Sequence, residues 1–443
     1  MATQTLANRW NAYMLEVYAS RKGPGPLGTV VFEEIEAQAK EKLQHVPGAF
    51  MYAAGTAGTG STYRANLRAF ERYRIVPRML VDATTRNLET LPADDDIRRH
   101  PPSPNLPLSN RRPIPLLSRR RTWPSSRCRR LSIPFVMSTV ATRSIELVAA
   151  ANGPTAHRWF QLYWPADPAV TLSILARAKA AGFAALVLTL DTMMAGWRTH
   201  DINTAYVPFR HGVSVQVGTS DPVFMRGIGR EPLTALEDHP QFPYDAADMD
   251  RRIAAGDARA KDAAELGAAW LKVANNGKFR TWDDLQFLRD NWDGPFLLKG
   301  IQSVQDAEKA LEYGVDGIVV SNHGGRQVDG AIPALYALAH IMKSPKVREA
   351  QASGKLTVLF DSGIRTGPDI FKALALGAQA VLVGRPYLYA SVVAGQAGVE
   401  QLIKHTVADL DTTLALAGYR SIAEIQGRAQ DVLLDLGEPV VES

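Results

Sequence analysis

The stretch Gly317-Ile318-Val319-Val320-Ser321-Asn322-His323-Gly324-Gly325-Arg326-Gln327 places a short β-branched apolar run directly before a group of polar residues. Such a continuous run is typical of a strand buried in a parallel sheet. In α/β enzymes the chemistry lies at the carboxyl ends of these strands. His323 can accept a proton near neutral pH, and Arg326 can hold a carboxylate through two parallel hydrogen bonds. Taken alone, the stretch also fits a core histidine followed by a surface turn.

Similar apolar runs lie on both sides of this stretch and alternate with helical patterns. The expected strands are 133–139, 157–164, 185–191, 296–299, 318–321, 356–361 and 380–384. The expected helices are 144–151, 169–181, 282–291, 305–313, 334–342, 368–376 and 398–417, with an irregular stretch at 192–260.

Repeated βα units indicate a parallel sheet. Seven units, preceded by a stretch where another would stand, predict a (β/α)8 TIM barrel over residues 133–428 with a tail at 429–443. A doubly wound open sheet is the alternative. It is disfavoured because no expected strand is followed by G-x-G-x-x-G.

Residues 1–91 are expected to form a helical segment that leads into the barrel. The pattern predicts helices at 32–43 and 62–73, the second ending before Pro77. Between them, 49–58 is rich in small residues and contains Tyr52. It fits either a helix with close neighbours or a tyrosine presented from a glycine-rich turn.

Residues 92–132 differ from the rest of the chain. Pro, Arg and Ser dominate, and 97–130 holds ten arginines and no acidic residue. Without these arginines the net charge of +5 becomes −5, with 40 basic residues against 45 acidic ones. By itself the segment is typical of a disordered basic linker that tethers a protein to nucleic acid or membrane. The remainder of the chain gives no sign of nucleic-acid binding.

Several classes of protein are disfavoured. The single cysteine, Cys128, allows no disulfide within the chain and fits a reducing compartment. Residues 1–18 lack the pattern of a secretory signal, and no window approaches the ~20 apolar residues of a membrane span. We therefore expect a cytoplasmic protein that is not bound to a membrane, and we expect no metal site.

A barrel brings the carboxyl ends of its strands to one mouth. At these ends the sequence carries polar residues or a glycine beside an arginine. They are Ser138, Gln161, Tyr163, Thr189, Asp191, Lys299, Ser321, His323, Asp361, Gly384 and Arg385. Lys299 alone is equally well explained as a structural lysine, but the whole set favours a functional site.

The last two strand ends resemble a phosphate site. One is followed by Gly363 and Arg365 and then directly by a helix, and the other by Gly384 and Arg385. Backbone N–H groups at the glycines can approach phosphate oxygens, and the arginines supply charge. Barrels commonly bind phosphate at this place. Two ordinary turns with glycine caps are the alternative, but phosphate binding is favoured because both turns carry Gly and Arg at adjacent barrel positions.

Together these motifs resemble the FMN-dependent α-hydroxy-acid oxidase and dehydrogenase family. The resemblance rests on Ser321-Asn-His-Gly-Gly-Arg-Gln327, Asp361-Ser-Gly-Ile-Arg365, Gly384-Arg-Pro386, Leu188-Thr-Leu-Asp191, Gly196-Trp-Arg198 and Phe160-Gln-Leu-Tyr163. Within the family, 199–281, Trp282-Asp-Asp284 and Lys299-Gly-Ile-Gln302 are most similar to the lactate 2-monooxygenase branch. The likeness runs from about residue 8 to 91 and from 133 to about 428.

The resemblance implies an FMN enzyme that oxidises a small L-2-hydroxy acid, most simply lactate, with O2 as the second substrate. His323 would be the base, Asp191 its partner, and Tyr163 a hydrogen-bond donor to the substrate oxygen. Arg326 would bind the substrate carboxylate with Tyr52, and Arg198 would lie nearby. The residues implied to hold FMN are Ser138, Gln161, Thr189, Lys299, Ser321, Asp361, Gly363, Arg365, Gly384 and Arg385.

The implied products are acetate, CO2 and water, as in a monooxygenase. An oxidase that releases the 2-oxo acid and hydrogen peroxide is the alternative. The resemblance also implies a homotetramer or higher homo-oligomer.

The family's first barrel strand ends in a segment like A-P-x-G beside the flavin, and residues 92–132 contain nothing similar. We interpret this stretch as the product of a compensated reading-frame shift or of an unspliced error in the gene model. The alternative is a divergent insertion in a chain that has lost its first strand. Either interpretation predicts poor folding or weak FMN binding, and it leaves open a catalytically impaired homologue.

Overall fold

The computed structural model describes residues 12–88, 133–154, 156–235, 239–274 and 277–437, together with the backbone of 116–120. Eight parallel strands close into a barrel in the order β2-β3-β4-β5-β6-β7-β8-β9. They are β2 (Leu116–Arg120), β3 (Phe135–Ser138), β4 (Arg158–Leu162), β5 (Ala185–Thr189), β6 (Phe296–Ile301), β7 (Gly317–Val320), β8 (Thr357–Phe360) and β9 (Ala380–Val383). The predicted barrel is confirmed, and the open-sheet alternative is wrong.

Strand β2 lies inside the segment that departs from the family pattern. Its backbone pairs with β3 through Ser118 and Phe135, and with β9 through Leu117 and Leu382. The alternative in which the chain has lost its first strand is therefore wrong. The other residues of 92–132 lie outside the described part of the chain.

Barrel strands β3 to β9 are buried on both faces, which explains their mostly apolar sequences. Along β5, Ala185 and Val187 belong to a small cluster with Val319 and Leu359 inside the barrel. The alternate residues, Leu186 among them, belong to the large core between strands and helices. This alternation places the side chains of each strand in two separate packed layers.

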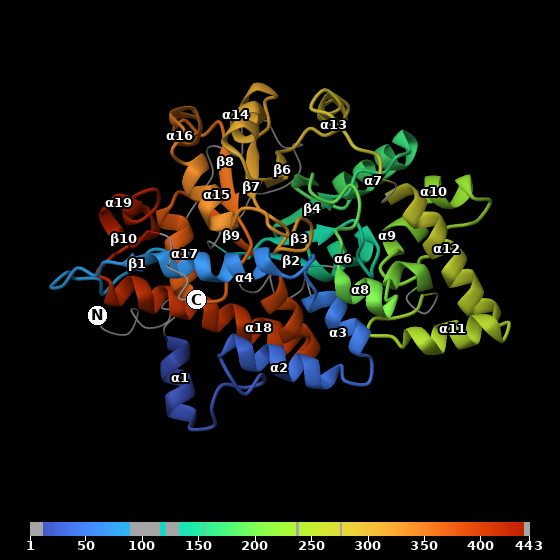
Figure 1. The fold of residues 1–443 in the computed structure, drawn as a ribbon, viewed down its shortest axis with the longest axis horizontal. Coiled ribbons are helices and arrows are strands. Elements are labelled where there is room, and N and C mark those ends of the chain that lie inside the picture. The colour runs from blue at the N-terminus through green and yellow to red at the C-terminus, as the bar shows by residue number, and fades with distance from the viewer. Residues whose placement is uncertain are drawn as a thin grey trace.

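Helices surround the barrel (Figure 1). They are α6 (Ile145–Asn152), α7 (Pro168–Ala180), α13 (Leu285–Asn291), α14 (Val304–Glu312), α15 (Ala334–Ile341), α16 (Pro345–Ala352), α17 (Gly367–Ala375) and α18 (Arg385–Leu416). Side-chain caps from Ser144, Asp167 and Ser303 fix where α6, α7 and α14 begin. Helix α18 begins directly after β9, earlier than predicted, and is kinked at Ala394 and Gly395.

The N-terminal segment packs outside the barrel. It contains α1 (Ala12–Ser20), α2 (Phe32–Lys42), α3 (Pro47–Ala54), α4 (Ser61–Arg68) and η1 (Ala69–Arg72). Helix α2 lies along α18 (Figure 1). The helix interpretation of 49–58 is confirmed for α3, whereas the helix predicted to reach residue 73 gives way to β1 (Tyr73–Ile75).

Strand β1 pairs antiparallel with β10 (Leu433–Asp435), which follows η4 (Ile422–Glu424) and α19 (Ala429–Val432). The C-terminal tail predicted at 429–443 therefore packs against the N-terminal segment as far as residue 437.

The stretch 192–260 is more helical than expected. It holds α8 (Thr199–Thr204), η2 (Pro208–His211), α9 (Gln216–Thr219), α10 (Pro222–Gly227) and α11 (Ala246–Ala254), and α12 (Ala258–Ala274) follows it. These helices gather at one side of the barrel (Figure 1). Most are too short to show a helical period, so side-chain caps from Asp221 and Asp245 are their main local signal.

Candidate active site

Asp191 follows β5 and His323 follows β7, and the two side chains form a close pair although β6 lies between these strands. His323 Nδ1 lies 2.7 Å from Asp191 Oδ1 and 3.1 Å from Thr192 Oγ1. If His323 Nδ1 donates to the carboxylate, Nε2 is the basic nitrogen. The pair can therefore take up a proton at Nε2 while the carboxylate stabilises the resulting positive charge.

The backbone after β7 is shaped to present His323. The φ angles of His323, Gly324 and Gly325 are all positive, at 59°, 66° and 72°. A left-handed conformation is uncommon for histidine and costs free energy that the surrounding structure must offset. At Gly325 a Cβ would lie 2.6 Å from the backbone N of Tyr63, so only glycine allows this approach.

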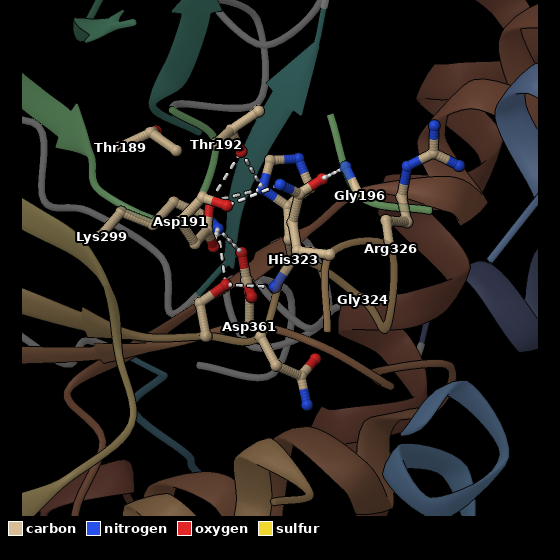
Figure 2. A network of polar contacts seen from close by, with 12 residues as sticks. Thr189, Asp191, Thr192, Gly196, Lys299, His323, Gly324, Arg326 and Asp361 are labelled. Atoms are coloured by element: carbon tan, nitrogen blue, oxygen red, sulfur yellow. Dashed lines mark hydrogen bonds and ion pairs between the residues drawn. The ribbon is translucent and has the colours of Figure 1, made fainter. Parts of the chain in front are cut away.

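Lys299 connects this pair to the next strand ends (Figure 2). Its side chain is completely buried, and Nζ donates to Ser321 Oγ at 2.5 Å. The same nitrogen lies 3.1 Å from Asp361 Oδ2 and 3.8 Å from Asp191 Oδ2. The ends of β5, β6, β7 and β8 thus share one buried polar network.

A second row of hydrogen bonds crosses the ends of β3, β4 and β5. Ser138 Oγ donates to Gln161 Oε1 at 2.9 Å, and Gln161 Nε2 donates to Thr189 Oγ1 at 3.0 Å. All three side chains are buried. These two hydrogen bonds determine which atom of the Gln161 amide is the oxygen and which is the nitrogen.

A cavity of about 190 Å³ opens at the barrel mouth. Predicted site residues that line it are Tyr52, Ser138, Tyr163, His323, Arg326, Asp361, Gly363, Arg365, Gly384 and Arg385. Gln161, Thr189, Asp191, Arg198, Lys299 and Ser321 are not among its lining residues. Of these six, all but Arg198 belong to the two hydrogen-bonded networks beneath the cavity.

Arg326 and Arg198 make contacts that the sequence did not predict. Arg326 Nη1 donates to Gly55 O at 2.6 Å and Nη2 to Tyr52 O at 2.8 Å, at the end of α3. Arg198 Nη2 donates to Gln327 Oε1 at 2.6 Å. Burial, together with the charges of Arg198 and Arg385, lowers the pKa of Arg326 well below its ordinary value. Because a guanidinium stays charged in proteins, Arg326 is repelled by Arg198 and Arg385, and a bound anion would relieve this repulsion.

The far end of the cavity has the groups that a phosphate requires. Arg365 Nε and Nη2 and Arg385 Nε are buried and have no hydrogen-bond partner among the described residues. Burial lowers the pKa of Arg385, and the neighbouring Arg365 adds to the effect. A Cβ at Gly384 would meet no atom within 4 Å. Two half-buried arginines with buried, unbonded nitrogens beside this space fit the phosphate of a nucleotide cofactor.

Sequence reasoning missed several residues of the site. Thr192 Oγ1 contacts His323, and Gln327 donates to the backbone oxygen of Asp191 in the loop after β5. Ser362 accepts a hydrogen bond from Gly324 N at 3.0 Å. Ser362 lies within the recognised Asp361–Arg365 motif, which was its only signal. Cavity residues Pro208, Ser214 and Phe242 come from the stretch expected to be irregular, where no motif marked them.

Among the residues that the structure describes, no helix has the length and apolar character that crossing a membrane requires. No group of three or more His, Cys, Asp or Glu side chains among them is arranged to hold a metal ion.

The chain is similar to known proteins over most of its length. A model of the FMN-dependent dehydrogenase family matches residues 39–431. An FMN-dependent alpha-hydroxy acid dehydrogenase of Penicillium citrinum is 39% identical over 393 residues, which is 88% of this chain and 87% of that protein. An L-lactate oxidase of Lysinibacillus sphaericus is 35% identical over 404 residues, covering 89% and 90% of the two chains.

Solved structures agree as well. A crystal structure of mandelate oxidase superposes with a TM-score of 0.65 at 30% identity, covering 92% of this chain and 98% of the other. The barrel, the polar strand ends and the paired arginines thus occur in a chain that aligns with flavoenzymes over most of its length. The chain belongs to the FMN-dependent dehydrogenase family and is an FMN-dependent α-hydroxy-acid oxidoreductase.

Proposed function

We propose that the substrate is a small L-2-hydroxy acid, most simply lactate, and that O2 is the electron acceptor. The observation that carries this proposal is the His323–Asp191 pair, 2.7 Å apart, at a cavity also lined by Tyr52, Tyr163 and Arg326. This set offers a base, hydroxyl donors and a cation at one cavity. A 2-hydroxy acid needs these groups for its hydroxyl and carboxylate.

The protein's own groups handle the proton and the carboxylate. His323 takes a proton from the hydroxy acid, and Asp191 stabilises the imidazolium and fixes its tautomer. Arg326 binds the carboxylate with help from Tyr52 and Arg198, exchanging part of its contact with the carbonyls of α3 for the substrate. Tyr163 donates a hydrogen bond to the substrate oxygen.

FMN, when bound, accepts the two electrons removed from the hydroxy acid. Ser138, Gln161, Thr189 and Ser321 would hydrogen-bond its ring and ribityl chain. Lys299 would face the pyrimidine edge and balance negative charge there. Asp361, Gly363, Arg365, Gly384 and Arg385 would hold the ribityl chain and phosphate.

The fate of the 2-oxo acid separates two versions of this function. In the monooxygenase version, lactate and O2 give acetate, CO2 and water. In the oxidase version they give pyruvate and hydrogen peroxide, and the relatedness to an L-lactate oxidase favours it. Purified holoenzyme incubated with lactate decides between them. Acetate without peroxide supports the first, and equal amounts of pyruvate and peroxide support the second.

A third possibility is a catalytically impaired homologue, because residues 92–132 depart from the family pattern. Flavin content and turnover with lactate test it together, since a protein that holds FMN and oxidises lactate contradicts it.

We further propose a cytoplasmic homotetramer or higher homo-oligomer that binds neither nucleic acid nor membrane. Light scattering of the purified protein tests its oligomeric state, and retention on DNA at low and high salt tests the arginine-rich segment as a tether.

A further inference from the structure

We propose that Gln327 is a positioning residue that joins the two active-site loops and sets the places of Asp191 and Arg198. The inference rests on the proposed function, because it assigns these two residues to the histidine and the substrate carboxylate. One loop, 191–198, carries Asp191 and Arg198. The other, 323–327, carries His323 and Arg326.

The amide of Gln327 makes four hydrogen bonds, all to the first loop. Nε2 donates to Asp191 O at 2.6 Å and to Met194 O at 2.9 Å. Oε1 accepts from Arg198 Nη2 at 2.6 Å and from Gly196 N at 3.3 Å. The contact with Gly196 is drawn in Figure 2. A primary amide can donate two hydrogen bonds and accept two, so this side chain is fully used.

The two loops are also in direct backbone contact. Arg198 Nε donates to Arg326 O at 3.1 Å. A Cβ at Gly196 would lie 2.5 Å from the carbonyl oxygens of Arg326 and Gln327. The hydrogen bond between His323 and Asp191 spans the same two loops. Its length therefore depends on how closely Gln327 holds them together.

The two halves of the amide have separable roles. The acceptor oxygen orients the guanidinium of Arg198, so its loss is expected to weaken substrate binding. The donor nitrogen holds the backbone of Asp191, so its loss is expected to slow proton transfer to His323. Gln327→Glu keeps the acceptor half and places a second oxygen against two carbonyls. Gln327→Leu has a similar size and removes both halves.

The test uses the wild-type holoenzyme, both Gln327 variants and Gln401→Leu. Gln401 is a matched control because it is buried and bonds Leu27 N at 2.6 Å and Thr29 O at 2.9 Å, outside the site. We expect Gln327→Leu to raise KM for lactate and Kd for oxalate by at least ~10-fold and to lower kcat by at least ~10-fold. Gln327→Glu should lower kcat similarly while KM stays within ~3-fold of wild type.

A second measurement does not depend on activity. Hydrogen exchange of the 190–198 backbone amides should be faster in Gln327→Leu than in wild type and unchanged in Gln401→Leu. The proposal is overturned if exchange in this segment is unchanged, or if Gln401→Leu produces the same kinetic losses. If the wild-type protein oxidises no 2-hydroxy acid and binds no oxalate, the proposed function fails, and the exchange result alone decides the role of Gln327.

Discussion

Lys299 Nζ lies 3.1 Å from Asp361 Oδ2, and the lysine side chain has no exposed surface. A buried ammonium is costly unless it is paired and hydrogen-bonded. Here the second partner is Ser321 and the third, more distant one is Asp191. The pairing lets a full positive charge lie beneath the cavity, where it can face a bound flavin.

Replacing Lys299 by methionine keeps the volume of the side chain and removes its charge. Because the buried carboxylate of Asp361 then loses the ammonium group beside it, we expect the free energy of unfolding to fall by ~3–5 kcal/mol. We expect kcat to fall by ~100-fold through the loss of electrostatic stabilisation. Chemical denaturation and steady-state kinetics measure the two effects. Lys372→Met is the control, because Lys372 donates to Phe70 O. This variant should change stability and leave kcat unchanged.

The variant Asp191→Asn tests the pairing of His323. The amide has the shape of the carboxylate but cannot stabilise an imidazolium, and it favours the wrong tautomer. We expect kcat to fall by ~10³–10⁴-fold while FMN stays bound. Thr192→Val, which removes only the hydroxyl 3.1 Å from His323 Nδ1, should cost less than ~10-fold. A kcat for Asp191→Asn within ~10-fold of wild type would contradict His323 as the base.

The barrel and most of its mouth were predictable because most strands are apolar runs followed by a polar residue or by a glycine beside an arginine. Thr192 and Gln327 were not, since they act through hydrogen bonds between residues 131 and 136 positions apart. No local pattern records such contacts. Strand β2 was missed because its residues LLSRR include none of the β-branched or aromatic residues that every other barrel strand contains. The helices of 199–254 were missed because short helices depend on tertiary packing more than on periodicity.

Asp329 should make stability depend on pH in the acid range. Burial raises its pKa, but hydrogen bonds from Thr59, Thr62 and Ser61 outweigh this and hold the pKa of Asp329 well below its ordinary value. A carboxyl with a lowered folded pKa stabilises the protein above its unfolded pKa of ~3.9, and this contribution is lost as the pH falls further. Asp329→Asn should therefore be less stable than wild type at pH 7, and the difference should shrink below about pH 4. Midpoints of urea unfolding for wild type and Asp329→Asn, at pH 7 and below about pH 4, test this prediction. A difference in stability that does not change with pH would contradict it.

We expect the protein with this sequence at residues 92–132 to bind FMN weakly. The arginines proposed to hold the phosphate, Arg365 and Arg385, line the cavity, but residues 92–132 lack a sequence like the family's A-P-x-G. Purified protein should contain less than one FMN per chain, and the ratio should rise with added FMN. Stoichiometric flavin that survives dialysis would contradict this prediction. A transcript that encodes residues 92–132 without a frame change would contradict the reading-frame interpretation.

Arg365 and Arg385 are expected to supply much of the affinity for FMN. Their unbonded guanidinium atoms lie buried at the cavity, so a phosphate would gain charge-assisted hydrogen bonds without displacing other partners of those atoms. Replacing either arginine by alanine should raise the Kd for FMN by ~10–100-fold, and the affinity that remains should depend less on salt. Quenching of FMN fluorescence on titration with apoprotein gives these Kd values, and Arg259→Ala, at an exposed position on α12, is the control. If both variants bind FMN as tightly as Arg259→Ala, the phosphate lies elsewhere. Riboflavin, which lacks the phosphate, should bind wild type and both variants alike, because the two arginines act on the phosphate alone.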